Sequence, residues 1–416
     1  MTPQIKQRIE QIRRGEVPEG YKKTKGGIVP SAWASFSLGD IYAERKEVGI
    51  PSLPILTVSI HSGVSDGALD EDELGKKVKR IEDKTQYRTA RSGDVVFNMM
   101  RAWQGAIGVV RQDGLVSPAY IVATPNEVVY PPFMDYCLKT PQMINRLHRK
   151  SYGVTDFRLR LYWDSFASVG CALPPLDEQK KIAEILSAQD KLIALKEKLI
   201  EEKKRQKKAL MQQLLTGKKR LPGFSDEWKP TKLKKLLKER KTYSQKGLEY
   251  PHVTLSTDGI YAKTERYDRE HLVKSEDKEY KITHKGDICY NPANLKFGVI
   301  CVNTFGDAIF SPIYVTFELQ KGVDLGFLSN YLMRWDFINA VRKYEEGTVY
   351  ERMAVKPEDF LKFEIKLPSI EEQKAISKIL SLYDSEIELL KNDLYQEKQK
   401  KKALMQLLLT GIVRAK

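Results

Sequence analysis

Four short segments of this 416-residue chain hold residue types that perform chemistry in other proteins. Residues 130–133 (Tyr-Pro-Pro-Phe) have the proline pair and ring of a loop that holds a target amino group. Such a loop needs a leading amide or carboxylate to accept a hydrogen bond, and Tyr130 supplies neither. Residues 291–293 (Asn-Pro-Ala) have the amide but lack the second proline and the ring. Residues 82–84 and 276–278 contain the Glu-x-Lys of metal-dependent nucleases, a pattern that so charged a chain contains by chance.

The remaining search for reactive groups returns no motif. The four cysteines form no Cys-x-x-Cys pair and the five histidines do not cluster near them, which argues against a zinc site or a disulfide framework. No glycine-rich cofactor loop, Walker-type phosphate loop or His-Glu-x-x-His motif occurs. The chain is therefore predicted to be non-catalytic, without a metal or cofactor of its own. A stand-alone methyltransferase or nuclease is the alternative, and it would need a loop that the sequence does not show.

Residues suited to contacting DNA do occur in loops that follow β-rich runs. Arginine bonds guanine and glutamine bonds adenine in the major groove. The alternative interpretation of each candidate is a solvated loop or an arginine with a structural role. The candidates lie in three loop pairs and are His61, Ser62, Arg101, Trp103, Gln104, Tyr152, Arg158, Arg160, Thr257, Asn294, Lys296, Tyr350 and Arg352.

An internal repeat organises the elements that must position these loops. Residues 173–217 and 367–411 align without a gap at an offset of 194, with 23 of 45 positions identical. Upstream, fainter matches pair 87–97 with 280–290 and Trp33 with Trp228. The order is therefore a variable region followed by a conserved one, twice over. Two copies of one scaffold have acquired different loops.

Each conserved copy is predicted to be one long helix. Apolar residues recur at alternating spacings of three and four, which is a heptad seam. Ser369 and Glu372 have capping-box spacing, and Gly217 and Gly411 supply helix stops. We expect the two helices to pair as an antiparallel coiled coil, although each helix could instead pack on its own domain. The seam residues are Ile182, Leu186, Ile193, Ile200, Ile376, Leu380, Tyr383, Ile387, Leu390 and Leu394.

The variable regions predict an α+β fold, with short β-rich runs between turn signals and helical stretches after them. No regular strand–helix alternation occurs, so a small irregular barrel-like sheet with attached helices fits better than a doubly wound sheet. The predicted organisation is a pseudo-two-fold repeat with these parts: an entry segment 1–29, a recognition domain 30–172, a helix 173–217, a basic linker plus second recognition domain 218–366, and a helix 367–416.

The repeated Leu-Pro-x-x-x-Glu-Gln-Lys-x-Ile at 173–182 and 367–376 resembles the conserved-helix signature of type I restriction–modification specificity (S) subunits. The Ala-Leu-Met-Gln…Leu-Leu-Thr-Gly endings and the entry stretch Pro-Glu-Gly-Tyr at 18–21 are similar to that family as well. The resemblance covers essentially the whole chain. Base-contacting residues vary freely in the family, so no site residue carries over by position.

The resemblance implies a sequence-specific DNA-recognition subunit. Each recognition domain would read one half of a split, asymmetric site on double-stranded DNA, and the coiled coil would set the spacer. Two modification (M) subunits, which bind S-adenosylmethionine and methylate adenine N6, would dock on a single copy of this chain. Restriction (R) subunits would add ATP- and Mg-dependent translocation and cleavage. The competing interpretation is a coiled-coil scaffold or adaptor without base readout.

The charge distribution refines this interpretation. The net charge of +15 suggests a polyanion partner. Yet 30–172 carries only +1 and 242–366 carries −2, whereas 218–241 alone carries +7. The excess therefore marks phosphate-facing junctions or surfaces against an acidic M subunit rather than the reading loops. The polar N-terminus and the lack of a long apolar run predict a cytoplasmic protein without a membrane span.

Overall fold

The computed structural model describes residues 2–24, 26–60, 63–65, 81–153, 155, 158–245, 249–257, 259–263, 279–346 and 353–415. Two compact units divide the chain. Unit 1 comprises residues 1–196 and 393–416, and unit 2 comprises residues 197–392. Each unit therefore contains one variable region together with one half of each long helix. None of the described helices is long and apolar enough to cross a membrane.

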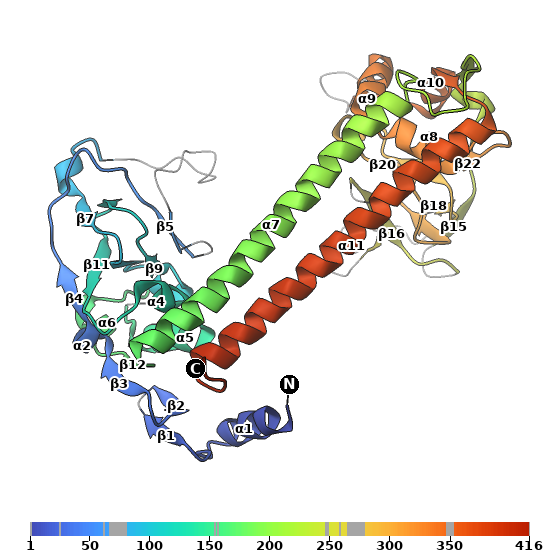
Figure 1. The fold of residues 1–416 in the computed structure, drawn as a ribbon. Coiled ribbons are helices and arrows are strands. Elements are labelled where there is room, and N and C mark those ends of the chain that lie inside the picture. The colour runs from blue at the N-terminus through green and yellow to red at the C-terminus, as the bar shows by residue number, and fades with distance from the viewer. Residues whose placement is uncertain are drawn as a thin grey trace. The chain divides into compact units, whose positions relative to one another are not determined.

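Unit 1 begins with a helix and a hairpin and continues into a mixed domain (Figure 1). Its elements are α1 (Pro3–Arg13), β1 (Tyr21–Thr24), β2 (Gly27–Pro30), β3 (Ala34–Ser37), α2 (Leu38–Ile41), β4 (Tyr42–Arg45), β5 (Val58–Ser59), β6 (Gly63–Val64), η1 (Lys84–Gln86), β7 (Arg88–Ala90), β8 (Val95–Asn98), η2 (Ala102–Gln104), β9 (Ile107–Val109), β10 (Gly114–Val116), β11 (Tyr120–Pro125), α4 (Pro131–Leu138), α5 (Pro141–Lys150), α6 (Trp163–Ala167) and β12 (Gly170–Leu173).

Unit 2 follows a similar order without the entry helix and hairpin, with the 3-10 helix η3 in the place of α2. Its elements are β13 (Lys229–Lys232), η3 (Leu233–Lys235), β14 (Leu237–Glu239), β15 (Tyr243–Gln245), β16 (Val253–Ser256), β17 (Gly259–Ala262), β18 (Glu279–Thr283), β19 (Ile288–Tyr290), η6 (Leu295–Phe297), β20 (Ile300–Val302), β21 (Ala308–Phe310), β22 (Val315–Leu319), α8 (Leu325–Leu332), α9 (Trp335–Val341), η7 (Arg342–Tyr344), β23 (Glu345–Glu346), β24 (Ala354–Val355), α10 (Pro357–Lys362) and β25 (Glu364–Leu367).

The two units share the topology of their main sheet. The main antiparallel sheet has the order β4-β11-β8-β9 in unit 1 and β14-β22-β19-β20 in unit 2. A two-stranded ribbon accompanies each sheet, β12 with β3 and β25 with β13. The inward faces of the strands form the cores with the attached helices, through side chains such as Phe97 and Phe166 in unit 1 and Tyr290 and Phe360 in unit 2. The predicted α+β repeat is confirmed.

The long helices are α7 (Leu176–Leu214) and α11 (Ile370–Leu409). Within each unit, the two helix halves lie side by side and antiparallel (Figure 1). In unit 1, Lys196 pairs with Asp393, and Lys401 lies 2.5 Å from Asp190. In unit 2, Lys203 lies 2.6 Å from Glu386, and Lys207 lies 2.6 Å from Asp384. Partner numbers fall along α11 as they rise along α7, so the antiparallel coiled coil is confirmed.

All ten predicted seam residues are buried or half-buried. A polar side chain interrupts the seam at Gln189, which is 7% exposed. Its amide donates a hydrogen bond to the Glu397 carboxylate at 2.6 Å. A buried polar contact of this kind favours one register over its alternatives. The predicted capping box is only half formed: the Glu372 amide bonds to Ser369 Oγ at 3.4 Å, but the Glu372 carboxylate points elsewhere.

That carboxylate and its repeat equivalent, Glu178, each join a helix start to a helix end. In unit 2, Glu372 accepts two hydrogen bonds from Arg220 at 2.7 and 2.8 Å and one from Trp228 Nε1 at 3.1 Å. In unit 1, Glu178 accepts two from Arg414 at 2.6 and 2.7 Å and one from Trp33 Nε1 at 3.3 Å. We call each of these three-residue sets a clasp. The unit 2 clasp is Arg220, Glu372 and Trp228, and the unit 1 clasp is Arg414, Glu178 and Trp33.

Candidate nucleic-acid interface

The β8–η2–β9 turn of unit 1 and the β19–η6–β20 turn of unit 2 have the same backbone. Asn98 Oδ1 accepts the Met100 amide at 2.9 Å, and Asn291 Oδ1 accepts the Ala293 amide at 3.1 Å. Each turn closes on a glycine at positive φ, 101° at Gly105 and 81° at Gly298, a conformation that L side chains rarely adopt. The scaffold of both turns is therefore fixed by these residues and leaves the intervening side chains to differ.

The side chains on the unit 1 turn divide into exposed and packed groups. Arg101 and Gln104 are exposed. Trp103 is half-buried, its Nε1 donates to the Met100 carbonyl at 2.9 Å, and its ring lies 5.4 Å from the His148 ring. Trp103 therefore shapes the turn, and its N–H is already occupied. The two exposed side chains are the ones able to reach a ligand.

The unit 2 turn carries different chemistry in the same place. Asn294 and Lys296 are half-buried, and Phe297 is exposed. The Lys296 ammonium lies 5.3 Å from the centre of the Phe297 ring, a cation–π contact. Counted back from the glycine stop, Arg101 and Gln104 of unit 1 correspond to Asn294 and Phe297 of unit 2. The Lys296 ammonium stands at the position of Trp103.

A second candidate loop of unit 1 is closed by a β-bridge. The Tyr152 amide donates to the Arg160 carbonyl at 3.0 Å, and the Arg160 amide donates back at 2.9 Å. Tyr152 is 58% exposed and Arg158 and Arg160 are exposed. A Cβ on Gly153 would lie 2.3 Å from the Arg158 carbonyl oxygen, so this close approach requires glycine. One exposed ring and two guanidinium groups therefore share one short loop.

The other candidates have separate positions. Thr257 is exposed in the turn between β16 and β17. His61, Ser62, Tyr350 and Arg352 lie outside the described residues.

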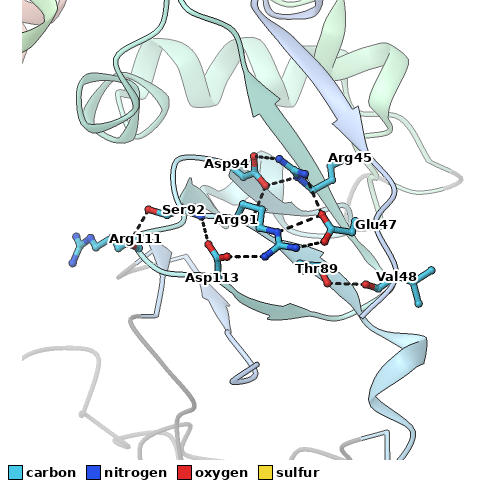
Figure 2. Close-up of polar contacts among 9 residues, drawn as sticks. All are labelled: Arg45, Glu47, Val48, Thr89, Arg91, Ser92, Asp94, Arg111 and Asp113. Atoms are coloured by element: carbon cyan, nitrogen blue, oxygen red, sulfur yellow. Dashed lines mark hydrogen bonds and ion pairs between the residues drawn. The ribbon is translucent and has the colours of Figure 1, made fainter. Parts of the chain in front are cut away.

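A polar network in unit 1 joins Arg45 of β4 to Asp94, which directly precedes β8, the strand that leads into the β8–η2–β9 turn (Figure 2). The Asp94 carboxylate accepts a hydrogen bond from Arg45 Nε at 2.7 Å and another from the Arg91 amide at 2.8 Å. Arg91 in turn pairs with Glu47, and with Asp113 at 2.8 Å. The Arg91 hydrogen bonds lower the pKa of both the Glu47 and the Asp113 carboxyl groups.

The same anchor recurs in unit 2, where the matched segments 87–97 and 280–290 place Asp287 at the position of Asp94. Asp287 accepts Arg240 Nε at 2.9 Å and the His284 amide at 2.8 Å. Hydrogen bonding to the aspartate raises the pKa of Arg240, as it does for Arg45. The remainder of the network differs, since Glu239 pairs with Lys281 at 3.1 Å.

The fragments considered for catalysis have structural roles where the structure describes them. The Tyr130 amide, at the start of α4, bonds Gln179 Oε1 at 2.9 Å. Asp83 accepts the Thr85 amide at 2.9 Å, and Lys84 donates to the Pro51 carbonyl at 2.9 Å. Residues 276–278 lie outside the described residues.

The four cysteines are free thiols buried in the two units. Burial raises the pKa of the Cys137 thiol to about 11 and that of Cys289 to about 12, so neither is a ready nucleophile. Within the described part of the chain, no group of three or more His, Cys, Asp or Glu residues could hold a metal ion.

These features define a class of protein: a duplicated recognition protein, in which one scaffold occurs twice and presents different exposed loops. Comparison with known proteins gives the family. The model described as "Type I restriction modification DNA specificity domain" matches residues 30–205 and again 225–397. The chain belongs to this family, and it is a type I specificity subunit with two target recognition domains.

Two relatives from Methanocaldococcus jannaschii match almost end to end. The putative type I restriction enzyme MjaX specificity subunit is 26% identical, with 96% of this chain and 97% of the relative covered. The type I restriction enzyme MjaVIII specificity subunit is 24% identical with the same coverage. Type I specificity subunits are generally non-catalytic.

Solved structures share the fold. The HsdS subunit from Thermoanaerobacter tengcongensis is 20% identical with a TM-score of 0.50, covering 92% of this chain and 98% of that one. The S subunit from M. genitalium is 13% identical with a TM-score of 0.52, covering 90% and 96%. A chain from a study of complex assembly and conformational transition of the type I R-M system is 18% identical with a TM-score of 0.58, covering 92% and 99%.

Proposed function

We propose that each unit reads one half of a bipartite, asymmetric DNA site. The observation that carries this proposal is the pair of equivalent turns after β8 and β19, which share an asparagine anchor and a glycine stop but differ in their exposed side chains. Equivalent scaffolds present their loops in equivalent ways, so different side chains give different half-sites.

In unit 1, we propose that Arg101 and Gln104 contact base edges, since both are exposed and both suit the major groove. Tyr152, Arg158 and Arg160 supply further base or phosphate contacts from the bridged loop. In unit 2, Asn294, Lys296 and Thr257 take these roles. His61, Ser62, Tyr350 and Arg352 remain predictions on sequence grounds. Trp103 acts by supporting its turn.

We further propose that α7 and α11 set the spacer between the half-sites. Helix-to-helix ion pairs occur in both units and hold the register of each half. A helix has a fixed rise of about 1.5 Å per residue, so its length is a suitable ruler.

The subunit would act in a complex. Two M subunits with bound S-adenosylmethionine would dock on one copy of this chain, each held where a target adenine is flipped out of the duplex. R subunits, with ATP and Mg, would bind when present. The location would be the cytoplasm. The duplicated architecture supports this proposal because two equivalent surfaces suit two identical partners.

A chimera tests independent reading. Residues 30–172 are exchanged for those of another specificity subunit, and adenine methylation is mapped by single-molecule sequencing in cells that carry the M subunit. One half-site should change and the other should stay the same. A change in both halves would refute independent reading.

An insertion tests the ruler. Four residues added before Ala209 and before Ala403 lengthen both helices by about 6 Å, close to two base-pair steps of about 3.4 Å. The mapped site should keep both halves with a longer spacer, and an unchanged spacer would contradict the ruler.

The second candidate is a coiled-coil scaffold without base readout. It predicts that the M-containing complex binds all duplexes equally. Salt-dependent binding that prefers one sequence would exclude it.

A further inference from the structure

Five exposed lysines lie within ten residues at the start of the variable region of unit 2. They are carried by the continuous segment β13–η3–β14, whose buried side chains Leu233, Leu236 and Leu237 point into the core. The lysines occupy the solvent side of this segment: Lys229, Lys232, Lys234, Lys235 and Lys238. We call this set the lysine surface.

The charge of the lysine surface is not neutralised. Within the described part of the chain, none of its five ammonium groups has an ion-pair partner, whereas the neighbouring Lys241 pairs with Glu239 at 3.4 Å. The exposed acidic groups nearby in the fold include Asp226 and Glu227, which precede β13, and Glu364, which lies across from Lys232 in the β13–β25 register. Glu318 lies across from Lys238 in the β14–β22 register, but its carboxylate is 3.9 Å from the Arg240 guanidinium. None of these four carboxylates pairs with the lysines.

Unit 1 contains the matched segment without the charge. At an offset of 195, β3–α2–β4 occupies the same place, and β3 pairs with β12 as β13 pairs with β25. The buried positions remain apolar as Leu38, Ile41 and Tyr42. The five lysine positions are instead Ala34, Ser37, Gly39, Asp40 and Ala43. The fold therefore does not need the lysines, and the charge belongs to unit 2 alone.

We propose that the lysine surface binds the phosphate backbone of duplex DNA independently of sequence, and that only unit 2 makes this contact. The inference rests on the proposed function, which supplies the duplex. Lysine acts on phosphate as a point charge and releases bound counterions. Protein interfaces rely on aromatic, Met and Arg anchors and are depleted in Lys. Residues 229–241 include no exposed large apolar side chain, so nucleic acid fits this surface better than a protein partner does.

The test compares two charge variants in the complex with the M subunit. All five lysines are replaced by glutamine in one variant and by arginine in the other, and affinity for the mapped target duplex is measured from 50 to 200 mM salt. Each phosphate contact adds about −0.9 to the log–log salt slope. If each of the five lysines makes one phosphate contact, the salt slope of the glutamine variant should be shallower than that of the wild type by about 4.5. Wild type would then lose about 500-fold more affinity over this fourfold salt range than the glutamine variant.

The arginine variant should keep the wild-type slope, and both variants should methylate the same sequence. The reciprocal change, Ala34→Lys with Ala43→Lys, should add about 2 to the slope, since each new lysine offers one contact. Both alanines are exposed, whereas Gly39 is left alone because a Cβ there would lie 2.9 Å from the Ala167 Cβ.

An unchanged slope in the glutamine variant would overturn the inference. An unchanged slope together with lost M-subunit assembly would also overturn it and identify the surface as a protein-docking site. If wild type showed no sequence preference while the glutamine variant still lost its salt slope, the lysine surface would stand and the proposed half-site reading would fail.

Discussion

The two clasps offer a matched pair of perturbations. Glu372 is 1% exposed and holds Arg220 in unit 2, and Glu178 is 6% exposed and holds Arg414 in unit 1. Truncation of one arginine leaves a nearly buried carboxylate with a single remaining side-chain donor, the tryptophan N–H. Loss of one partner from a buried pair costs about 3–5 kcal/mol. Because the arginines retain some solvent contact, we expect the lower end, about 3 kcal/mol.

Hydrogen exchange resolved by peptide is the appropriate assay, because a chain with two units does not unfold in one two-state step. Arg220→Ala should reduce protection in β19 and β22 of unit 2 and leave β8 and β11 of unit 1 near wild type. Arg414→Ala should do the reverse. A local cost of about 3 kcal/mol corresponds to exchange roughly 150-fold faster in the affected core.

A double-mutant cycle separates charge burial from packing. Glu372→Gln keeps the shape of the side chain and removes its charge, so Arg220→Ala should cost only about 1 kcal/mol in that background. The reasoning would be refuted if Arg220→Ala cost the same in both backgrounds, or if it weakened both units equally.

Two further predictions concern unit 1. The lowered pKa values of Glu47 and Asp113 mean that their stabilisation is fully present above the unfolded carboxyl values near 4 and is lost as the pH falls through the folded values. Arg91→Leu should therefore reduce the dependence of the stability of unit 1 on pH between about pH 5 and 3. Hydrogen-exchange protection of β7 and β10 measures this stability, and an unaltered pH profile would contradict the network. Gly153→Ala should disrupt the Tyr152–Arg160 bridge and reduce DNA affinity without altering the unit 2 half-site, because its Cβ would meet the Arg158 carbonyl at 2.3 Å; unchanged affinity in a binding titration would remove that loop from the interface.

The repeat made the large-scale fold readable from sequence. A gapless 45-residue duplication with heptad spacing identifies two equivalent long helices, and periodicity alone selects the face that is buried. Gly217 and Gly411 marked the helix ends, and both adopt positive φ, 71° and 70°. Local sequence patterns carry this information because helix geometry repeats every few residues.

The partners of individual side chains were harder to predict from the sequence. Glu372 was expected to complete a capping box three residues from Ser369, yet its carboxylate pairs with Arg220, 152 positions away. Trp103 looked like a ligand-facing ring, yet its N–H bonds the Met100 carbonyl and its ring faces His148. The ion pairs of Lys203 with Glu386 and of Lys207 with Asp384 likewise join residues of α7 and α11 that are far apart in the chain.

The sequence by itself determined that one scaffold occurs twice, that two long helices pair, and that the net charge lies outside the recognition regions. Those properties follow from spacing and composition, which are local. Only the tertiary structure decided which exposed side chains are free to bind, which carboxylates are already committed to arginines, and that five lysines on one unit lack acidic partners. Those properties depend on contacts between residues distant in the chain, and a hydrogen bond used inside the fold is no longer available for recognition.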